Sequence, residues 1–86
     1  MYINALVAED SAIQAEMLRR KLVEGGYVVT VVRDGEEAMA SFLSAPPDIA
    51  ILDIIMPKMS GIEVCQQIKD NHLLRHIPVV LATALE

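Results

Sequence analysis

The 86-residue sequence is poor in aromatic and basic residues and has a single cysteine. Aromatic residues make up 3% of the chain and apolar residues 53%, so the core must be built mainly from aliphatic side chains and methionine. Seven basic residues are set against twelve acidic ones, for a net charge of -5. This balance argues against direct binding of nucleic acid, because phosphate contacts need clustered cations. The one basic cluster, Arg19 to Lys21, is more typical of a solvated helix face than of a binding patch.

Long apolar runs and a signal segment are also lacking. No apolar run approaches the roughly 20 residues needed to span a bilayer, and residues 1–10 show no basic stretch leading into an apolar one. Cys65 alone cannot form an internal disulfide. We therefore expect a cytoplasmic protein without membrane contact, folded as one small domain that needs a dense core.

Four short apolar segments predict the strands of a parallel sheet. Apolar runs without polar alternation are typical of strands covered on both faces, and they span residues 3–8, 27–32, 49–52 and 77–82. Between them lie three segments with apolar residues at helical spacing. The connections between strands are too long for hairpins, so the sequence predicts an α/β fold with a doubly wound parallel sheet.

Each predicted helix begins at a capping pattern, in which a cap residue is followed three positions later by Gln or Glu. The cap residues are Ser11, Asp34 and Ser60. Glycine, proline and polar residues are expected to end the helices, at Gly25-Gly26, at Ala45 and near Asp70-Asn71. In the first helix the predicted apolar stripe consists of Ile13, Met17, Leu18 and Leu22.

Polar side chains follow three of the predicted strands: Glu9 and Asp10 the first, Asp53 the third and Thr83 the fourth. In open α/β sheets, ligands bind beyond the carboxyl ends of the strands. Asp53 by itself also fits a turn or cap aspartate. Three carboxylates crowded into one crevice, however, repel each other unless a cation lies among them. Mg²⁺ is the natural partner because it combines carboxylate, water and phosphate ligands, and a carboxylate could then act as the nucleophile that forms an aspartyl phosphate.

These residues resemble the motifs of the receiver (phosphoacceptor) domain of bacterial two-component response regulators. The resemblance covers the whole chain, in order and at family spacing, through Glu9-Asp10, Asp53, Met56-Pro57, Gly61 and Thr83-Ala84. It implies a flavodoxin-like fold with strand order 2-1-3-4-5, of which four strands in the order 2-1-3-4 are expected here. It also implies a phosphorylation-dependent signalling switch that is phosphorylated by a histidine kinase or a phosphotransfer protein.

The resemblance further implies roles for individual residues. Asp53 is the implied phosphoacceptor, and Mg²⁺ is held by Asp10 directly, by Glu9 mostly through water, by Asp53 and by the backbone carbonyl of Ile55. Thr83 is the implied switch hydroxyl. A phosphate is a far better acceptor for this hydroxyl than a distant carboxylate, so phosphorylation is expected to draw Thr83 inward.

The sequence departs from the family after the fourth strand. Residues 1–86 predict an incomplete receiver domain without the fourth helix, the fifth strand and the fifth helix. The lysine that pairs with the phosphoryl group in the family, and the aromatic residue that follows the switch threonine, are therefore missing. Lys58, in the loop after Asp53, is not assigned that lysine's role. Losing one such electrostatic contact costs a factor of about a hundred or more, so we expect the chain alone to be phosphorylated poorly.

The last predicted strand is an open apolar edge, and such edges pair with other chains. Three explanations are open: the chain is a piece of a longer receiver, it pairs with a second copy in a homodimer, or it is a short form completed by a partner. The first is favoured.

Four alternatives to a receiver site can be compared with the sequence. A haloacid dehalogenase-type enzyme needs a second acid two residues after its nucleophile, where this sequence has Ile55, and a P-loop nucleotidase needs a Gly-rich run ending in Lys-Ser/Thr. A pseudo-receiver, which keeps the fold as an interaction module without phosphotransfer, stays open. Cys65, His72 and His76 have the spacing of a soft metal site, but the helix is expected to end before His76.

Overall fold

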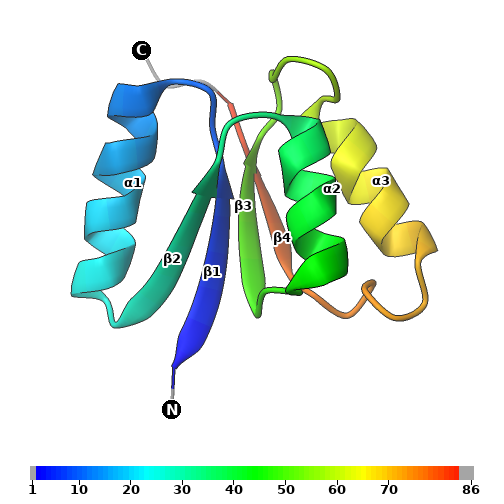
Figure 1. Ribbon diagram of the computed structural model, residues 1–86, viewed down its shortest axis with the longest axis horizontal. Helices are drawn as coiled ribbons and strands as arrows, with labels where there is room; N and C mark the ends of the chain where they lie inside the picture. The colour runs from blue at the N-terminus through cyan, green and yellow to red at the C-terminus, as the bar shows by residue number, and fades with distance from the viewer. Residues whose placement is uncertain (1, 84–86) are drawn as a thin grey trace.

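The computed structural model describes residues 2–83, which form one four-stranded parallel sheet and three helices (Figure 1). In chain order the elements are β1 (Ile3–Ala8), α1 (Ala12–Glu24), β2 (Tyr27–Val32), α2 (Gly35–Ser44), β3 (Ile49–Asp53), α3 (Gly61–Asp70) and β4 (Val79–Ala82). The strands are ordered β2-β1-β3-β4. The predicted α/β fold, a doubly wound parallel sheet in the order 2-1-3-4, is confirmed.

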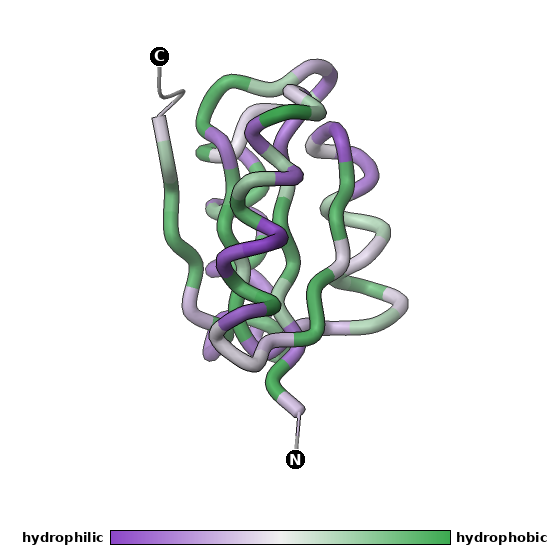
Figure 2. The backbone as a smooth tube through the Cα atoms, turned by 90° about the vertical axis from the view of Figure 1, so that its left-hand side faces the viewer, coloured by the Kyte–Doolittle hydropathy of each residue, from purple (hydrophilic) through white to green (hydrophobic). Residues whose placement is uncertain are grey.

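The main apolar core lies between the sheet and the pair α2 and α3. Side chains alternate between the two faces of a strand, and those of β1 and β3 on one face join α2 and α3 in a single buried cluster that includes Leu6, Phe42, Leu52 and Ile68. Helix α1 contacts β1 and β2 instead and contributes one buried residue, Ala15. In Figure 2 the strands are largely hydrophobic while the helices alternate hydrophobic and hydrophilic positions, as expected for a sheet covered by amphipathic helices.

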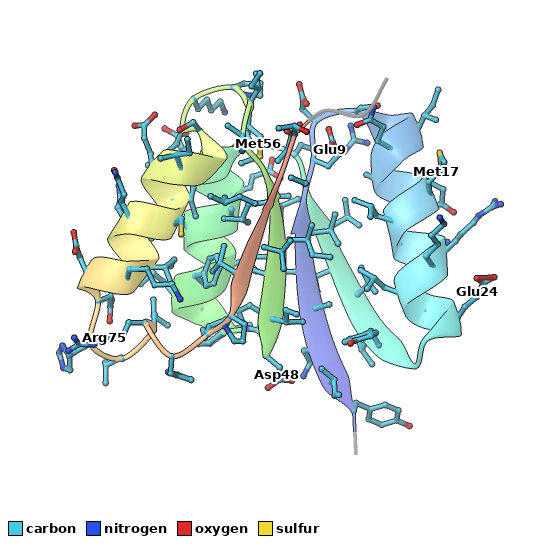
Figure 3. The ribbon with its side chains drawn as sticks, turned by 180° about the vertical axis from the view of Figure 1, so that it is seen from behind. Glu9, Met17, Glu24, Asp48, Met56 and Arg75 are labelled. Carbon is cyan, nitrogen blue, oxygen red and sulfur yellow. The ribbon has the colours of Figure 1, made fainter. Side chains whose placement is uncertain are left out.

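The register of the sheet determines which residues meet at its carboxyl edge. The last pair between β1 and β3 is Ala8 with Leu52, so the residues that follow these two strands emerge side by side. In Figure 3, Glu9 lies at this edge and Asp48 lies at the opposite end of the sheet. Parallel pairing therefore gathers the polar residues that follow the strands.

All three predicted N-caps are confirmed. The side chains of Ser11, Asp34 and Ser60 accept hydrogen bonds from the backbone N–H three residues later, at 3.3, 2.8 and 3.1 Å. At α3 the capping box is reciprocal, because the Glu63 carboxylate accepts from the Ser60 N–H at 3.3 Å. The start of α3 is thus fixed by local sequence, and with it the end of the loop that follows β3.

Replacing Ser60 with alanine is expected to lower the free energy of unfolding by about 1 kcal/mol, because the first turn of α3 loses its side-chain acceptor. Urea denaturation followed by circular dichroism measures the change. Ser44→Ala is the matched control, since the Ser44 hydroxyl donates to the Ala40 carbonyl at the exposed end of α2 and caps no N-terminus. Equal losses in the two variants would contradict the capping role.

The predicted start of the last strand is wrong. Strand β4 begins at Val79 rather than at Ile77. Pro78 has no N–H to donate to the sheet, and Ile77, which is 1% exposed, packs into the core from the connection that precedes the strand. The apolar run therefore predicted the buried segment correctly, but its first two residues lie outside the strand.

The predicted stripe of α1 is also wrong in part. Ile13 and Met17 are 77% and 57% exposed, and Met17 projects from the outer side of the helix in Figure 3. The side that faces the sheet carries buried Ala15 with half-buried Leu18 and Leu22, at the helical spacing i, i+3 and i+7. The buried residue on this side is therefore the small Ala15, which a stripe of large apolar side chains does not include.

Two of the three residues of the basic cluster, Arg19 and Arg20, bind an acid of their own helix. Arg19 binds Glu16 through Nε and Nη2, both at 2.7 Å, and Arg20 binds it through Nε at 2.9 Å. These hydrogen bonds lower the pKa of Glu16 to about 2. The arrangement agrees with the solvated helix face expected from the sequence.

Strand β4 forms one edge of the sheet in the described part of the chain. Its Val80 and Leu81 are 49% and 39% exposed. Pairing of this edge with a second copy stays a prediction. Among the helices within residues 2–83, none is both long enough and apolar enough to cross a membrane.

Candidate metal and phosphoacceptor site

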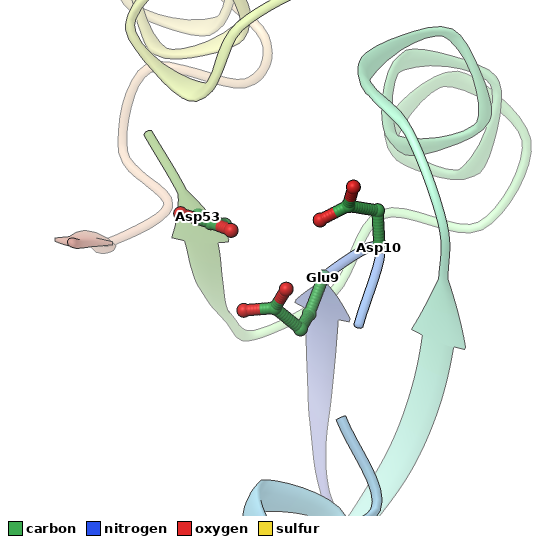
Figure 4. A group of neighbouring side chains, drawn as sticks. All are labelled: Glu9, Asp10 and Asp53. Carbon is green, nitrogen blue, oxygen red and sulfur yellow. The ribbon is translucent and has the colours of Figure 1, made fainter. Parts of the chain in front are cut away.

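Three carboxylates meet where β1 and β3 end (Figure 4). Glu9 and Asp10 follow β1, Asp53 is the last residue of β3, and each offers an oxygen within 4.8 Å of the other two. Glu9 and Asp53 are buried, at 6% and 5% exposure, whereas Asp10 is exposed. Over residues 2–83 this is the one group of three or more potential ligands close enough to hold a metal ion. The structure thus brings together the three acids that the sequence placed at one edge.

Backbone groups orient the two buried carboxylates. The Glu9 N–H donates to the Val32 carbonyl at 3.0 Å, which extends the pairing of β1 with β2 by one residue. The Glu9 carboxylate accepts from the Ser11 N–H at 3.0 Å, and Oδ1 of Asp53 accepts from the Ile55 N–H at 3.3 Å. Both side chains are therefore held by the turn that follows their own strand.

Crowding of the carboxylates has an electrostatic consequence. Burial raises the pKa of Glu9 above its usual 4.5, and the negative charge of Asp53, a hydrogen bond with the Asp53 carboxyl and the charge of Asp10 raise it further, while the Ser11 N–H opposes them. The group thus favours a positive charge among its oxygens. Three carboxylates are hard oxygen donors, the type that Mg²⁺ and Mn²⁺ prefer, so these residues fit a divalent cation.

Ile55 is close to this group along the chain, and Thr83 is brought near it by the pairing of β3 with β4. Asp53 pairs with Ala82 across β3 and β4, and the Ile54 N–H donates to the Ala82 carbonyl at 2.9 Å. Thr83 follows directly and is exposed. The side chain of Ile55 is 74% exposed. Thr83 is thus placed at the carboxyl edge, whereas Ala84, the other half of its motif, lies outside the described residues.

Sequence reasoning missed the partners of Lys58. Its Nζ lies 3.5 Å from Oδ2 of Asp34 and 3.9 Å from Oε1 of Glu36, at the junction of β2 and α2. Asp34 was predicted only as a cap, and residues so far apart in sequence carry no spacing signal that pairs them. Lys58 is therefore engaged away from the three carboxylates, and within the described residues no lysine or arginine forms an ion pair with them.

The weaker candidate site, formed by Cys65, His72 and His76, is not assembled in the structure. Helix α3 ends at Asp70, and both histidines lie beyond it in the connection to β4, where they are exposed. The three residues do not form a ligand group within residues 2–83. The end of the helix breaks the alignment that a continuous helix would produce.

The sequence of this chain matches a known protein family. The profile of the response regulator receiver domain family matches residues 5–86. The chain belongs to this family. As a receiver domain it is 42% identical over 86 residues to the response regulator PleD of Caulobacter vibrioides, a match that covers all of this chain and 19% of PleD.

Solved structures show the same relationship. The receiver domain of a signal transduction histidine kinase from Syntrophus aciditrophicus has a TM-score of 0.91 and 42% identity, over 96% of this chain and 63% of that chain. The Mn²⁺-bound form of the response regulator Rcp1 has a TM-score of 0.88 and 31% identity, over 98% of this chain and 67% of that chain. The receiver fold is thus shared well beyond the site, and the chain spans less than two thirds of PleD and of the Syntrophus receiver.

Proposed function

We propose that this receiver domain is a phosphorylation-dependent switch of a two-component system that accepts a phosphoryl group on Asp53 with the help of Mg²⁺. The observation that carries the proposal is the meeting of Glu9, Asp10 and Asp53, with oxygens within 4.8 Å of one another, at the carboxyl edge of a receiver fold. A buried carboxylate beside two others is suited to holding a cation and a phosphoryl group together.

The residues that would hold Mg²⁺ are Asp10, Glu9, Asp53 and the backbone carbonyl of Ile55. When bound, the ion neutralises charge on the carboxylates and on the incoming phosphoryl group. The existence of a Mn²⁺-bound form of Rcp1, a receiver-fold neighbour, supports a divalent cation in this chain.

Asp53 is the nucleophile of the proposed phosphoryl transfer. One carboxylate oxygen of Asp53 attacks the phosphorus of the donor, the bond from phosphorus to the donor breaks, and its electron pair leaves with the donor. The product is an acyl phosphate on Asp53. The Ile55 N–H, which binds Oδ1 at 3.3 Å, holds the carboxylate in one orientation for this attack.

The proposed donor is a histidine kinase or a phosphotransfer protein, as membership in the receiver family supports. Thr83 is the proposed switch, because its hydroxyl would donate to a phosphoryl oxygen far more strongly than to a carboxylate. Thr83 directly follows Ala82, the register partner of Asp53. Phosphorylation would thereby change the chain just after β4.

Incubation of the chain with acetyl phosphate and Mg²⁺, followed by intact-mass spectrometry, tests the proposal. We expect slow addition of one phosphoryl group that requires Mg²⁺, is blocked by a chelator and is removed by hydroxylamine, which cleaves acyl phosphates but not phosphoserine. The slow rate follows because, within the described residues, no cationic side chain pairs with the three carboxylates. Label that resists hydroxylamine would contradict the proposal.

The second candidate function is a pseudo-receiver, an interaction module that keeps the fold without phosphotransfer. The same lack of a paired cation in the described part of the chain favours it. Complete absence of label after prolonged incubation, in a chain that still binds a divalent cation, would select this alternative. Labelling at the rate of longer receivers would instead refute the expectation of slow transfer.

A further inference from the structure

The backbone of Lys58 is unusual. Its φ is 71°, and no other residue except glycine has a positive φ within residues 2–83. The Met59 N–H donates to the Pro57 carbonyl at 2.8 Å across Lys58. This is a γ-turn with a positive central φ, the rarer and more strained of the two γ-turn forms. A side chain persists in such a conformation only where its surroundings hold it there.

Two contacts from the junction of β2 and α2 hold this turn. The Lys58 ammonium lies 3.5 Å from Asp34, whose side chain is only 10% exposed, and 3.9 Å from Glu36. Beside the ion pair, Gly35 packs directly against Met59, and a Cβ on Gly35 would collide with the backbone carbonyl oxygen and the Cβ of Met59. The turn is thus held by the ion pair of Lys58 with Asp34 and by the close packing of Gly35 against Met59.

The turn of residues 57–59 belongs to the loop of residues 54–60, which begins next to Asp53 and includes Ile55. The base of this loop is also fixed, since the Gly61 N–H donates to the Ile54 carbonyl at 3.0 Å. A Cβ on Gly61 would collide with the backbone carbonyl of Asp53. Base and tip of the loop are therefore both anchored, but the tip depends on residues of another element.

We propose that Asp34, Gly35 and Lys58 form a loop clamp that positions residues 54–60 for metal binding. The inference rests on the proposed function, in which the carbonyl of Ile55 is a metal ligand. The three clamp residues would not contact the ion; they act through the loop. Groups that hold a metal ligand in place commonly change metal affinity by 10- to 100-fold when they are removed.

The ion pair is tested with Lys58→Gln, Asp34→Asn and the double variant. Asparagine still caps α2, so Asp34→Asn removes the charge and keeps the helix start. Lys21→Gln in the last turn of α1 is the control for the positive charge lost in Lys58→Gln, and Asp48→Asn is the control for the negative charge lost in Asp34→Asn. Two readouts are used: hydrogen exchange of the loop amides in the metal-free protein, and the affinity for Mn²⁺ measured by NMR relaxation.

We expect each single variant to speed exchange at the amides of Ile55 and Met59 and to weaken Mn²⁺ binding by about two- to fivefold, the range of a partly exposed ion pair. The double variant should be no worse than either single variant, because both remove the same contact. Loop exchange and affinity equal to those of the control, or effects that add fully in the double variant, would overturn the clamp.

Gly35→Ala tests the packing contact and should weaken Mn²⁺ binding by about tenfold or more, because the loop backbone must move. If this variant does not fold, the clamp is tested with the Lys58 and Asp34 variants alone. The two proposals fail differently. A wild-type chain that binds no Mn²⁺ would overturn the proposed function and, with it, the metal role of the clamp. Unchanged exchange at the loop amides would overturn the clamp while leaving the proposed function intact.

Discussion

Asp53→Asn is expected to abolish hydroxylamine-sensitive phosphorylation and to weaken Mg²⁺ or Mn²⁺ binding by at least about tenfold. Asparagine keeps the shape of the side chain and can still accept from the Ile55 N–H, which lies 3.3 Å from Oδ1. Its amide is not a nucleophile and carries no charge. The variant therefore removes the attacking oxygen and one of the metal ligands while leaving β3 in place. Intact-mass labelling and an Mn²⁺ titration measure the two losses.

Asp48→Asn is the matched control for this prediction. Asp48 precedes β3 at the opposite end of the sheet, where its carboxylate accepts from the Asn4 N–H at 2.7 Å (Figure 3). The substitution changes the same net charge next to the same strand but far from the three carboxylates. Labelling that persists in Asp53→Asn would show that Asp53 is not the phosphoacceptor, and equal loss in Asp48→Asn would show that the loss is not specific to Asp53.

Mg²⁺ is expected to stabilise the fold in a pH-dependent manner. The pKa of Glu9 is raised in the folded chain, chiefly by burial and further by Asp53 and Asp10. The protonated form is therefore favoured by folding, and this contribution is fully present below the ordinary pKa of 4.5 and is lost as pH rises through the raised value. Without metal, this group makes the chain less stable at neutral pH than in mild acid.

A bound cation replaces that proton. At a concentration 100 times its dissociation constant, Mg²⁺ should raise the free energy of unfolding by about 2.7 kcal/mol at neutral pH. The gain should shrink as pH falls toward 4.5, because protons compete for Glu9. Urea denaturation at matched ionic strength, with and without Mg²⁺, gives the values. A gain that is independent of pH, or that is the same in Asp53→Asn, would contradict the three-carboxylate site.

The sequence was sufficient for the order of elements and for the gathering of the acids. Continuous apolar runs and local caps depend on neighbouring residues alone, which is why the N-caps at Ser11, Asp34 and Ser60 are confirmed. Parallel strands place the residues that follow them at one edge, so Glu9 and Asp53 were predictable as neighbours once the strands were assigned.

Features that depend on tertiary packing were not predictable in this way. Ile13 and Met17 fit a helical stripe, yet they are exposed, and the buried residue of α1 is Ala15. Ile77 is buried without belonging to a strand. The contact of Lys58 with Asp34 joins two loops that are distant in sequence, and neither local propensity nor periodicity contains that information.

Addition of Mn²⁺ to the ¹⁵N-labelled chain tests the central claim most directly, because the paramagnetic ion broadens the amide signals nearest to it. The three-carboxylate site predicts that signals of residues 9–11 and 53–55 broaden first and recover when excess Mg²⁺ displaces Mn²⁺. Broadening centred instead on the other acidic segment, residues 34–37 at the start of α2, or no selective broadening at all, would contradict it.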